Sequence, residues 1–87
     1  MSQSLNILKS KVDELPNNIE AEQSVIGSIL VANEIFDEVS LIIQNKNFYD
    51  PIHQKIFQAI EKLIYGGMLA NPITLKNYFE KEKDDIN

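Results

Sequence analysis

The side chain with the greatest capacity for chemistry in this sequence is its single histidine, His53. Asp50 stands three residues before it, so the two can form a local cap contact or a pH-sensitive pair, because imidazole titrates near neutral pH. A histidine near a helix start, partly packed and partly in water, is the simpler interpretation, and we favour it. A metal site needs more ligands at coordinating spacing. With no second histidine and no cysteine, we expect no metal site.

Two glutamates are the next candidates for acid–base chemistry. Glu20 and Glu22 stand two residues apart on one predicted helix, so their side chains point in different directions, which is poor geometry for a paired acid and base. The electrostatics of a helix start explains both carboxylates. Ser24 and Ser28 lack a base at a triad-like position. We therefore expect no catalytic residue in this chain.

Cofactor and nucleic-acid sites are not expected either. Gly66 and Gly67 are not followed by the Lys-Ser/Thr end of a phosphate-binding P-loop, so we expect no nucleotide site and no bound cofactor in this chain. The formal net charge is −5 and arginine is absent, whereas DNA binding depends on clustered Lys and Arg. We expect no direct DNA binding and another protein as the partner.

The composition is typical of one soluble globular domain, with 44% hydrophobic and 24% charged residues in 87. Lys9 and Lys11 fall where a signal peptide needs its apolar core, and no apolar run is long enough to cross a bilayer. We expect a cytoplasmic protein that makes no membrane contact. Because cysteine is absent, packing alone must hold the domain together.

Capping residues and helical periodicity predict a first helix that begins after Asn17 or Asn18. Asn17 and Glu20 form a capping-box-like pair. Gly27 lies in the middle of this helix, where glycine costs about 1 kcal/mol relative to alanine, so we expect another helix to cross closely there. Three polar residues are expected away from the centre of the apolar face: Glu22, Gln23 and Ser28. The face itself comprises Ile19, Ala21, Val25, Ile26, Ile29 and Leu30.

A short second helix is predicted between Asn33, its cap candidate, and Ile43. A loop with Phe48 and Tyr49 follows. We expect the aromatic side chains to lie in the core or at its edge. The phenylalanines expected in the core are Phe36, Phe48, Phe57 and Phe79, and the tyrosines expected to close its edge are Tyr49, Tyr65 and Tyr78.

The third predicted helix runs from Pro51 to about Tyr65. Asp50 caps it, and Pro51 suits the first helical position, where its missing N–H has no cost. The helix stops at Gly66 and Gly67, as a left-handed C-terminal cap prefers. Its expected buried residues are Ile52, Ile56, Phe57, Ile60, Leu63 and Ile64.

Thr74 is the cap candidate of a fourth helix, whose inner side carries Leu75, Tyr78 and Phe79 and after which EKEKDDIN is solvated. The predicted fold class is all-α, a compact bundle of about four to five short helices. Residues 17–87 form this helical domain. Residues 1–16 form a flexible N-terminal tail or a short arm.

The tail carries a thin apolar stripe of Leu5, Leu8, Val12 and Leu15 at intervals of three and four. Such a stripe on an isolated helix is marginal in water. We favour a frayed tail over an arm in which Leu5, Leu8 and Val12 dock onto a neighbouring subunit.

One group of residues is a candidate protein interface. Tyr65, Met68 and Leu69 can together form an exposed apolar patch, and such patches usually mark contacts with other proteins.

Two segments resemble a known family: IEAEQSVIGSIL at 19–30 and FYDPIHQKIFQAI at 48–60. They are similar to the N-terminal domain of the bacterial replicative DNA helicase family, DnaB, in which an EAEQSV-G-x-x-L helix and an FY-x-x-x-H-x-x-IF-x-A-I helix recur in this order. The resemblance covers roughly residues 16–79. Among the motif residues that carry it are Glu20, Glu22, Gln23, Gly27, Phe48, Tyr49, His53, Phe57 and Thr74.

The resemblance implies a non-catalytic collar domain of a hexameric ring helicase. In the family, pairs of these domains assemble as a trimer of dimers, and primase and the helicase loader bind the collar. ATP and Mg²⁺ belong to a separate C-terminal domain, which hydrolyses ATP and moves along DNA. The resemblance therefore implies self-association, primase and loader as partners, and no cofactor in this chain.

The sequence departs from the family in two places. Relatives commonly have Gly-x-Pro-x-Asp before an Ile-Thr-Leu helix start, which is at 73–75 here. This chain instead has GMLAN at 67–71 and the proline at Pro72, so that loop is expected to differ in shape. The sequence also ends at Asn87, before the family's C-terminal helical hairpin and ATPase domain. We expect a piece of a longer protein that is a monomer or weak dimer in solution.

Two classes of function stay open. The favoured one is the helicase collar, which mediates ring assembly and primase or loader binding during DNA replication. The other is a freestanding small helical adaptor that binds replication partners. A small hydrolase or nuclease is disfavoured because the chemistry of a catalytic site is missing.

Overall fold

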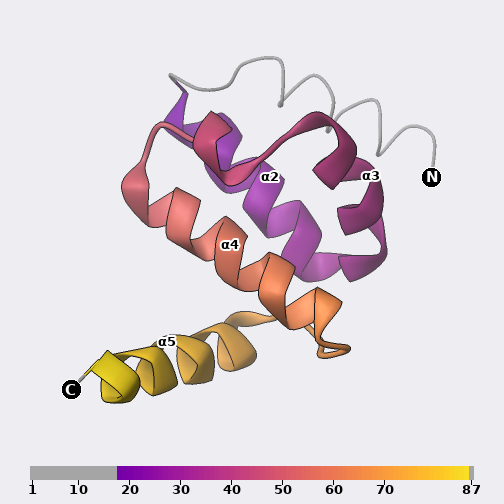
Figure 1. The fold of residues 1–87 in the computed structure, drawn as a ribbon. Coiled ribbons are helices and arrows are strands. Elements are labelled where there is room, and N and C mark those ends of the chain that lie inside the picture. Colours follow the sequence, from indigo (N-terminus) through magenta and orange to yellow (C-terminus); the bar gives the residue numbers. More distant parts are fainter. Residues whose placement is uncertain (1–17, 87) are drawn as a thin grey trace.

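The structure, a computed structural model, describes residues 18–86 as a set of helices (Figure 1). In this range there are no strands, so the predicted all-α class is confirmed. No helix in it is long and apolar enough to span a membrane. The tail assigned to residues 1–16 and the Asn17 capping pair lie outside the described residues. The elements are α2 (Ile19–Val31), η1 (Asn33–Ile35), α3 (Phe36–Ile42), η2 (Asn45–Asn47), α4 (Pro51–Tyr65) and α5 (Pro72–Ile86).

Side chains cap the starts of the long helices. The Asn18 side chain accepts a hydrogen bond from the Ala21 N–H at 3.0 Å and caps α2. Asp50 Oδ1 accepts from the Ile52 N–H at 2.8 Å and caps α4, as predicted. Each cap satisfies a backbone donor that has no partner within its helix.

The start of α5 differs from the prediction. Asn71, not Thr74, is the cap, because its Oδ1 accepts from the N–H groups of Ile73 and Thr74 at 2.9 Å. Thr74 lies in the first turn, where its hydroxyl accepts from the Asn71 N–H at 2.9 Å. Pro72 therefore occupies the first helical position, which its fixed φ favours. The helix also continues to Ile86, through most of the segment expected to follow it.

The end of α4 confirms the prediction. Gly67 has a φ of 80°, the left-handed conformation that glycine adopts without strain. The Gly67 N–H donates to the Ile64 carbonyl at 3.0 Å, and the Met68 N–H donates to the Leu63 carbonyl at 2.9 Å. These two bonds form a Schellman motif, which ends the helix and turns the chain toward α5.

The core lies between α2, α3 and α4 and is partly aromatic. The Phe57 ring lies 5.6 Å from Phe36 and 5.2 Å from Phe48 between centroids, and all three side chains are buried. Phe79 packs against the core from α5 while partly exposed. Ile52 was expected in the core but is 65% exposed, because the next residue, His53, takes the inward position in that turn.

The space around Gly27 contradicts the expected close helix contact. A Cβ atom built on Gly27 has no other atom within 4 Å apart from its own helix backbone and adjacent residues. No described helix crosses closely there. A glycine that lowers helix stability was expected to be required for close helix packing, but no packing contact within residues 18–86 requires a glycine at this position.

Replacing Gly27 with alanine is therefore expected to stabilise the domain by about 1 kcal/mol, because alanine lowers the entropic cost of the helix. Urea denaturation followed by circular dichroism measures the change. The matched control is Gly67→Ala, which should destabilise because its φ is positive. A destabilised Gly27→Ala variant would contradict the open environment.

Candidate interaction site

A buried carboxylate joins the first turn of α2 to the start of α4. The Glu22 side chain is fully buried. Its Oε2 accepts from the Tyr49 N–H at 2.6 Å, and its Oε1 accepts from the Asp50 N–H at 3.2 Å. Oε1 also lies 2.8 Å from His53 Nδ1. Because both oxygens already accept from backbone N–H groups, the consistent assignment is an accepting carboxylate and a hydrogen on Nδ1.

This arrangement corrects two predictions. Glu22 was expected away from the apolar face, yet it lies inside because three donors replace the water that a carboxylate loses on burial. His53 was expected to be partly in water or paired with Asp50, but it is 8% exposed and its partner is Glu22. Asp50 uses its carboxylate to cap α4 instead. The donors to Glu22 are all internal, so the contact fixes helices relative to each other.

The structure also shows where other residues of the two sequence motifs lie. Glu20 and Gln23 are exposed on α2. Phe48 is buried, with its ring centroid 6.4 Å from that of His53. Among the residues that the structure describes, no group of three or more His, Cys, Asp or Glu side chains could hold a metal ion.

The predicted interface residues lie at the last residue of α4 and on the turn between α4 and α5. Tyr65, Met68 and Leu69, hereafter the turn patch, are 65%, 56% and 64% exposed. Ile73 at the start of α5 is 71% exposed. Large apolar side chains in water carry a cost that burial against another molecule removes. The exposure is a finding, and the role of the turn patch as an interface stays a prediction.

The backbone of this turn is fixed by the Asn33 side chain. Asn33 Oδ1 accepts from the Ala70 N–H at 2.7 Å, and Asn33 Nδ2 donates to the Ala70 carbonyl at 3.0 Å. Nδ2 also donates to the Ile29 carbonyl at 2.8 Å, which anchors the amide on α2. The sequence suggested only a helix cap for Asn33, because a contact across 37 positions leaves no local pattern.

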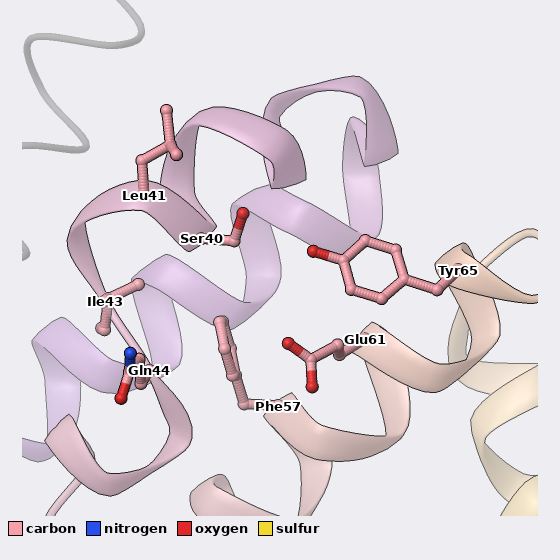
Figure 2. Close-up of a pocket in the computed structure, with 7 residues that line it drawn as sticks. All are labelled: Ser40, Leu41, Ile43, Gln44, Phe57, Glu61 and Tyr65. Atoms are coloured by element: carbon pink, nitrogen blue, oxygen red, sulfur yellow. The ribbon is translucent and has the colours of Figure 1, made fainter.

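A groove between α3 and α4 is a second surface feature, and the sequence did not predict it. Its volume is about 420 Å³. Figure 2 shows Tyr65 and Glu61 extending from α4 toward Ser40 on α3, while the Leu41 side chain points away from them. Phe57 and Ile43 are its buried lining residues, and Gln44 completes the lining.

An all-α bundle fixed by the Glu22 and Asn33 contacts, with an apolar turn in water, defines a small helical domain. The model of the DnaB-like helicase N terminal domain family matches residues 14–87. The chain belongs to this family, so the resemblance stated from the sequence is confirmed.

Curated relatives agree with the family match. The replicative DNA helicase DnaB of Rickettsia typhi is 40% identical over 88 residues, which cover 94% of this chain and 18% of the relative. The replicative DNA helicase DnaB of Rickettsia prowazekii is 46% identical over 68 residues, 78% of this chain and 14% of the relative. The replicative DNA helicase DnaB of Buchnera aphidicola subsp. Baizongia pistaciae is 38% identical over 72 residues, which cover 83% of this chain and 16% of the relative. The chain thus spans less than a fifth of each relative's length.

Replacing Glu22 with alanine is expected to destabilise the domain by about 3 kcal/mol or more, because two backbone N–H groups and the His53 ring lose their buried acceptor. Urea denaturation gives the free energy of unfolding. Glu20→Ala is the matched control, since Glu20 lies in the same helical turn but in water, and it should stay close to wild type. Equal effects of the two substitutions would show that Glu22 acts only through the helix dipole.

Proposed function

We propose that this domain is the non-catalytic N-terminal collar of a replicative DNA helicase, and that it mediates ring assembly and binds primase or the helicase loader. The family membership supports the proposal, because the relatives are named as replicative DNA helicases and this chain corresponds to 14–18% of their length. A domain that is a small part of a motor contributes contacts to the whole protein. The whole protein would act in the bacterial cytoplasm during DNA replication.

The observation that carries the proposal is the turn patch. Its three side chains are more than half exposed, yet the backbone beneath them is fixed by the Schellman motif and by the two Asn33–Ala70 hydrogen bonds. A rigid apolar surface loses little conformational entropy when it binds a partner. The turn patch is therefore suited to a protein partner.

ATP and Mg²⁺ enter the proposal only through another domain of the whole protein. The turn patch has no carboxylate to hold Mg²⁺ and no phosphate-binding loop, so we assign it no nucleotide. A reading frame that continues into a linker and a G-x-x-x-x-G-K-[ST] sequence would support the collar over the freestanding adaptor.

The test is to titrate the chain separately with its cognate primase and with its helicase loader, and to measure the binding by isothermal titration calorimetry. At least one is expected to bind, and Met68→Ser combined with Leu69→Ser should weaken that binding at least tenfold, about 1.4 kcal/mol, because buried apolar anchors carry much of the affinity of an interface. Leu41→Ser is the matched control, since Leu41 is 84% exposed on α3, outside the turn patch. It should bind like wild type.

Two results would contradict the proposal. Binding of neither partner, by this chain or by a longer one that includes the C-terminal hairpin, would remove the collar role. Equal binding by the double serine variant, with its fold verified by circular dichroism, would remove the turn patch as the contact.

A further inference from the structure

The accessible lining of the groove between α3 and α4 combines a carboxylate with an aromatic ring. Glu61 stands four residues after Phe57 and four before Tyr65, so the three side chains form one row along α4. The Glu61 carboxylate lies between the two rings in Figure 2, and Ser40 faces this row from α3. Phe57 is buried beneath, whereas Tyr65 is mostly exposed, so an occupant would meet Glu61 and the Tyr65 ring.

Glu61 gives the groove a negative charge. Among the described residues that line the groove, Glu61 alone is charged. The residues three and four positions from it on α4 are uncharged: Phe57, Gln58, Ile64 and Tyr65. Lys62 is next in the sequence and lies about 100° round the helix. Within residues 18–86 the Glu61 carboxylate has no salt bridge, so its charge is available to a cation from outside.

The surface beside the groove is acidic as well. Asp37 is exposed on α3, and its carbonyl accepts a hydrogen bond from the Ser40 hydroxyl at 2.9 Å, next to the groove. Glu34 and Glu38 are also exposed, and residues 33–44 contain no lysine or arginine. Lys46 is the first cation after this segment. Such a surface attracts a positively charged group and repels a phosphate or a carboxylate.

The Tyr65 ring narrows the choice of cation. Its centroid lies 5.7 Å from that of Phe36 in an edge contact with an interplanar angle of 77°, which holds the ring in place. A guanidinium group stacks on an aromatic ring and donates two parallel hydrogen bonds to a carboxylate, whereas an ammonium group is compact and strongly hydrated. The volume of about 420 Å³ lies in the range of pockets that enclose small ligands, so a side chain can enter.

Tyr65 also indicates where the guanidinium comes from. It belongs to both the groove and the turn patch, so a protein that covers the turn patch also reaches the groove. This chain contains no arginine, so a second copy cannot supply one. We propose that the α3–α4 groove binds an arginine side chain of the protein that covers the turn patch, with the guanidinium between Glu61 and the Tyr65 ring. The partner rests on the proposed function, whereas the pocket itself does not.

NMR titration of the isotope-labelled full chain tests the pocket without any partner. The probe is Nα-acetyl-arginine amide, and Nα-acetyl-citrulline amide is its matched control, because citrulline has nearly the same shape without the charge. The arginine probe should shift the amide signals of residues 40–44 and 61–65 and bind about threefold or more tightly than citrulline, the effect of one partly exposed ion pair. Nα-acetyl-lysine amide should bind more weakly than the arginine probe.

Two glutamine variants decide whether Glu61 is the acceptor. Glu61→Gln should remove the preference for arginine over citrulline. Glu80→Gln is the matched control, since it removes the same charge from an exposed position on α5, and it should keep the preference. Equal binding of arginine and citrulline by the wild type, or an unchanged preference in Glu61→Gln, would overturn the proposal. Lysine binding as tight as arginine would overturn the assignment to arginine.

Calorimetry with primase and loader tests the source of the arginine. Glu61→Gln should weaken the binding of the partner about threefold or more, and Glu80→Gln should not. Equal binding by wild type and Glu61→Gln would overturn the claim that the partner occupies the groove. If neither partner binds, the proposed function fails, and the arginine titration still decides whether the pocket exists.

Discussion

The interaction on which the rest of the structure depends is the buried Glu22 carboxylate. A charge without partners is excluded from a protein interior, so this position is occupied only because Tyr49, Asp50 and His53 all present hydrogens to the two oxygens. Two of these donors are backbone groups that lead into α4. The negative charge also lies at the start of that helix, where the macrodipole favours it.

Contacts at both ends of α4 determine where the turn patch and the α3–α4 groove lie. Glu22 fixes the start of α4 to the first turn of α2, and Asn33 fixes the turn after α4 to the other end of α2. Between these ends, Phe57 packs on Phe36 and Phe48. The turn patch and the α3–α4 groove therefore lie on a helix held at both ends, and Tyr65, which lines the groove, belongs to both surfaces.

Local rules predicted the parts of the fold that local interactions determine. Both ends of α4 were predicted correctly, from Asp50-Pro51 at its start and Gly66-Gly67 at its end, because capping involves residues only a few positions apart. Glu22 was misplaced because a glutamate in a first helical turn has a sufficient local explanation. A signal was present: Glu22 is spaced three, four and seven residues from Val25, Ile26 and Ile29, and so belongs to the apolar face. The Asn33–Ala70 contact and the groove gave no such signal, since each joins distant segments.

Hydrogen exchange at the Tyr49 amide tests the role of Glu22 most directly. Tyr49 lies in a bend before α4, and its N–H has no acceptor in a helix, only the Glu22 carboxylate. If that bond fixes the fold, the Tyr49 amide should exchange only when the whole domain unfolds, with a protection free energy equal to that of Phe57 in the core. Exchange of the Tyr49 amide at the rate of an open loop, while Phe57 stays protected, would contradict the account.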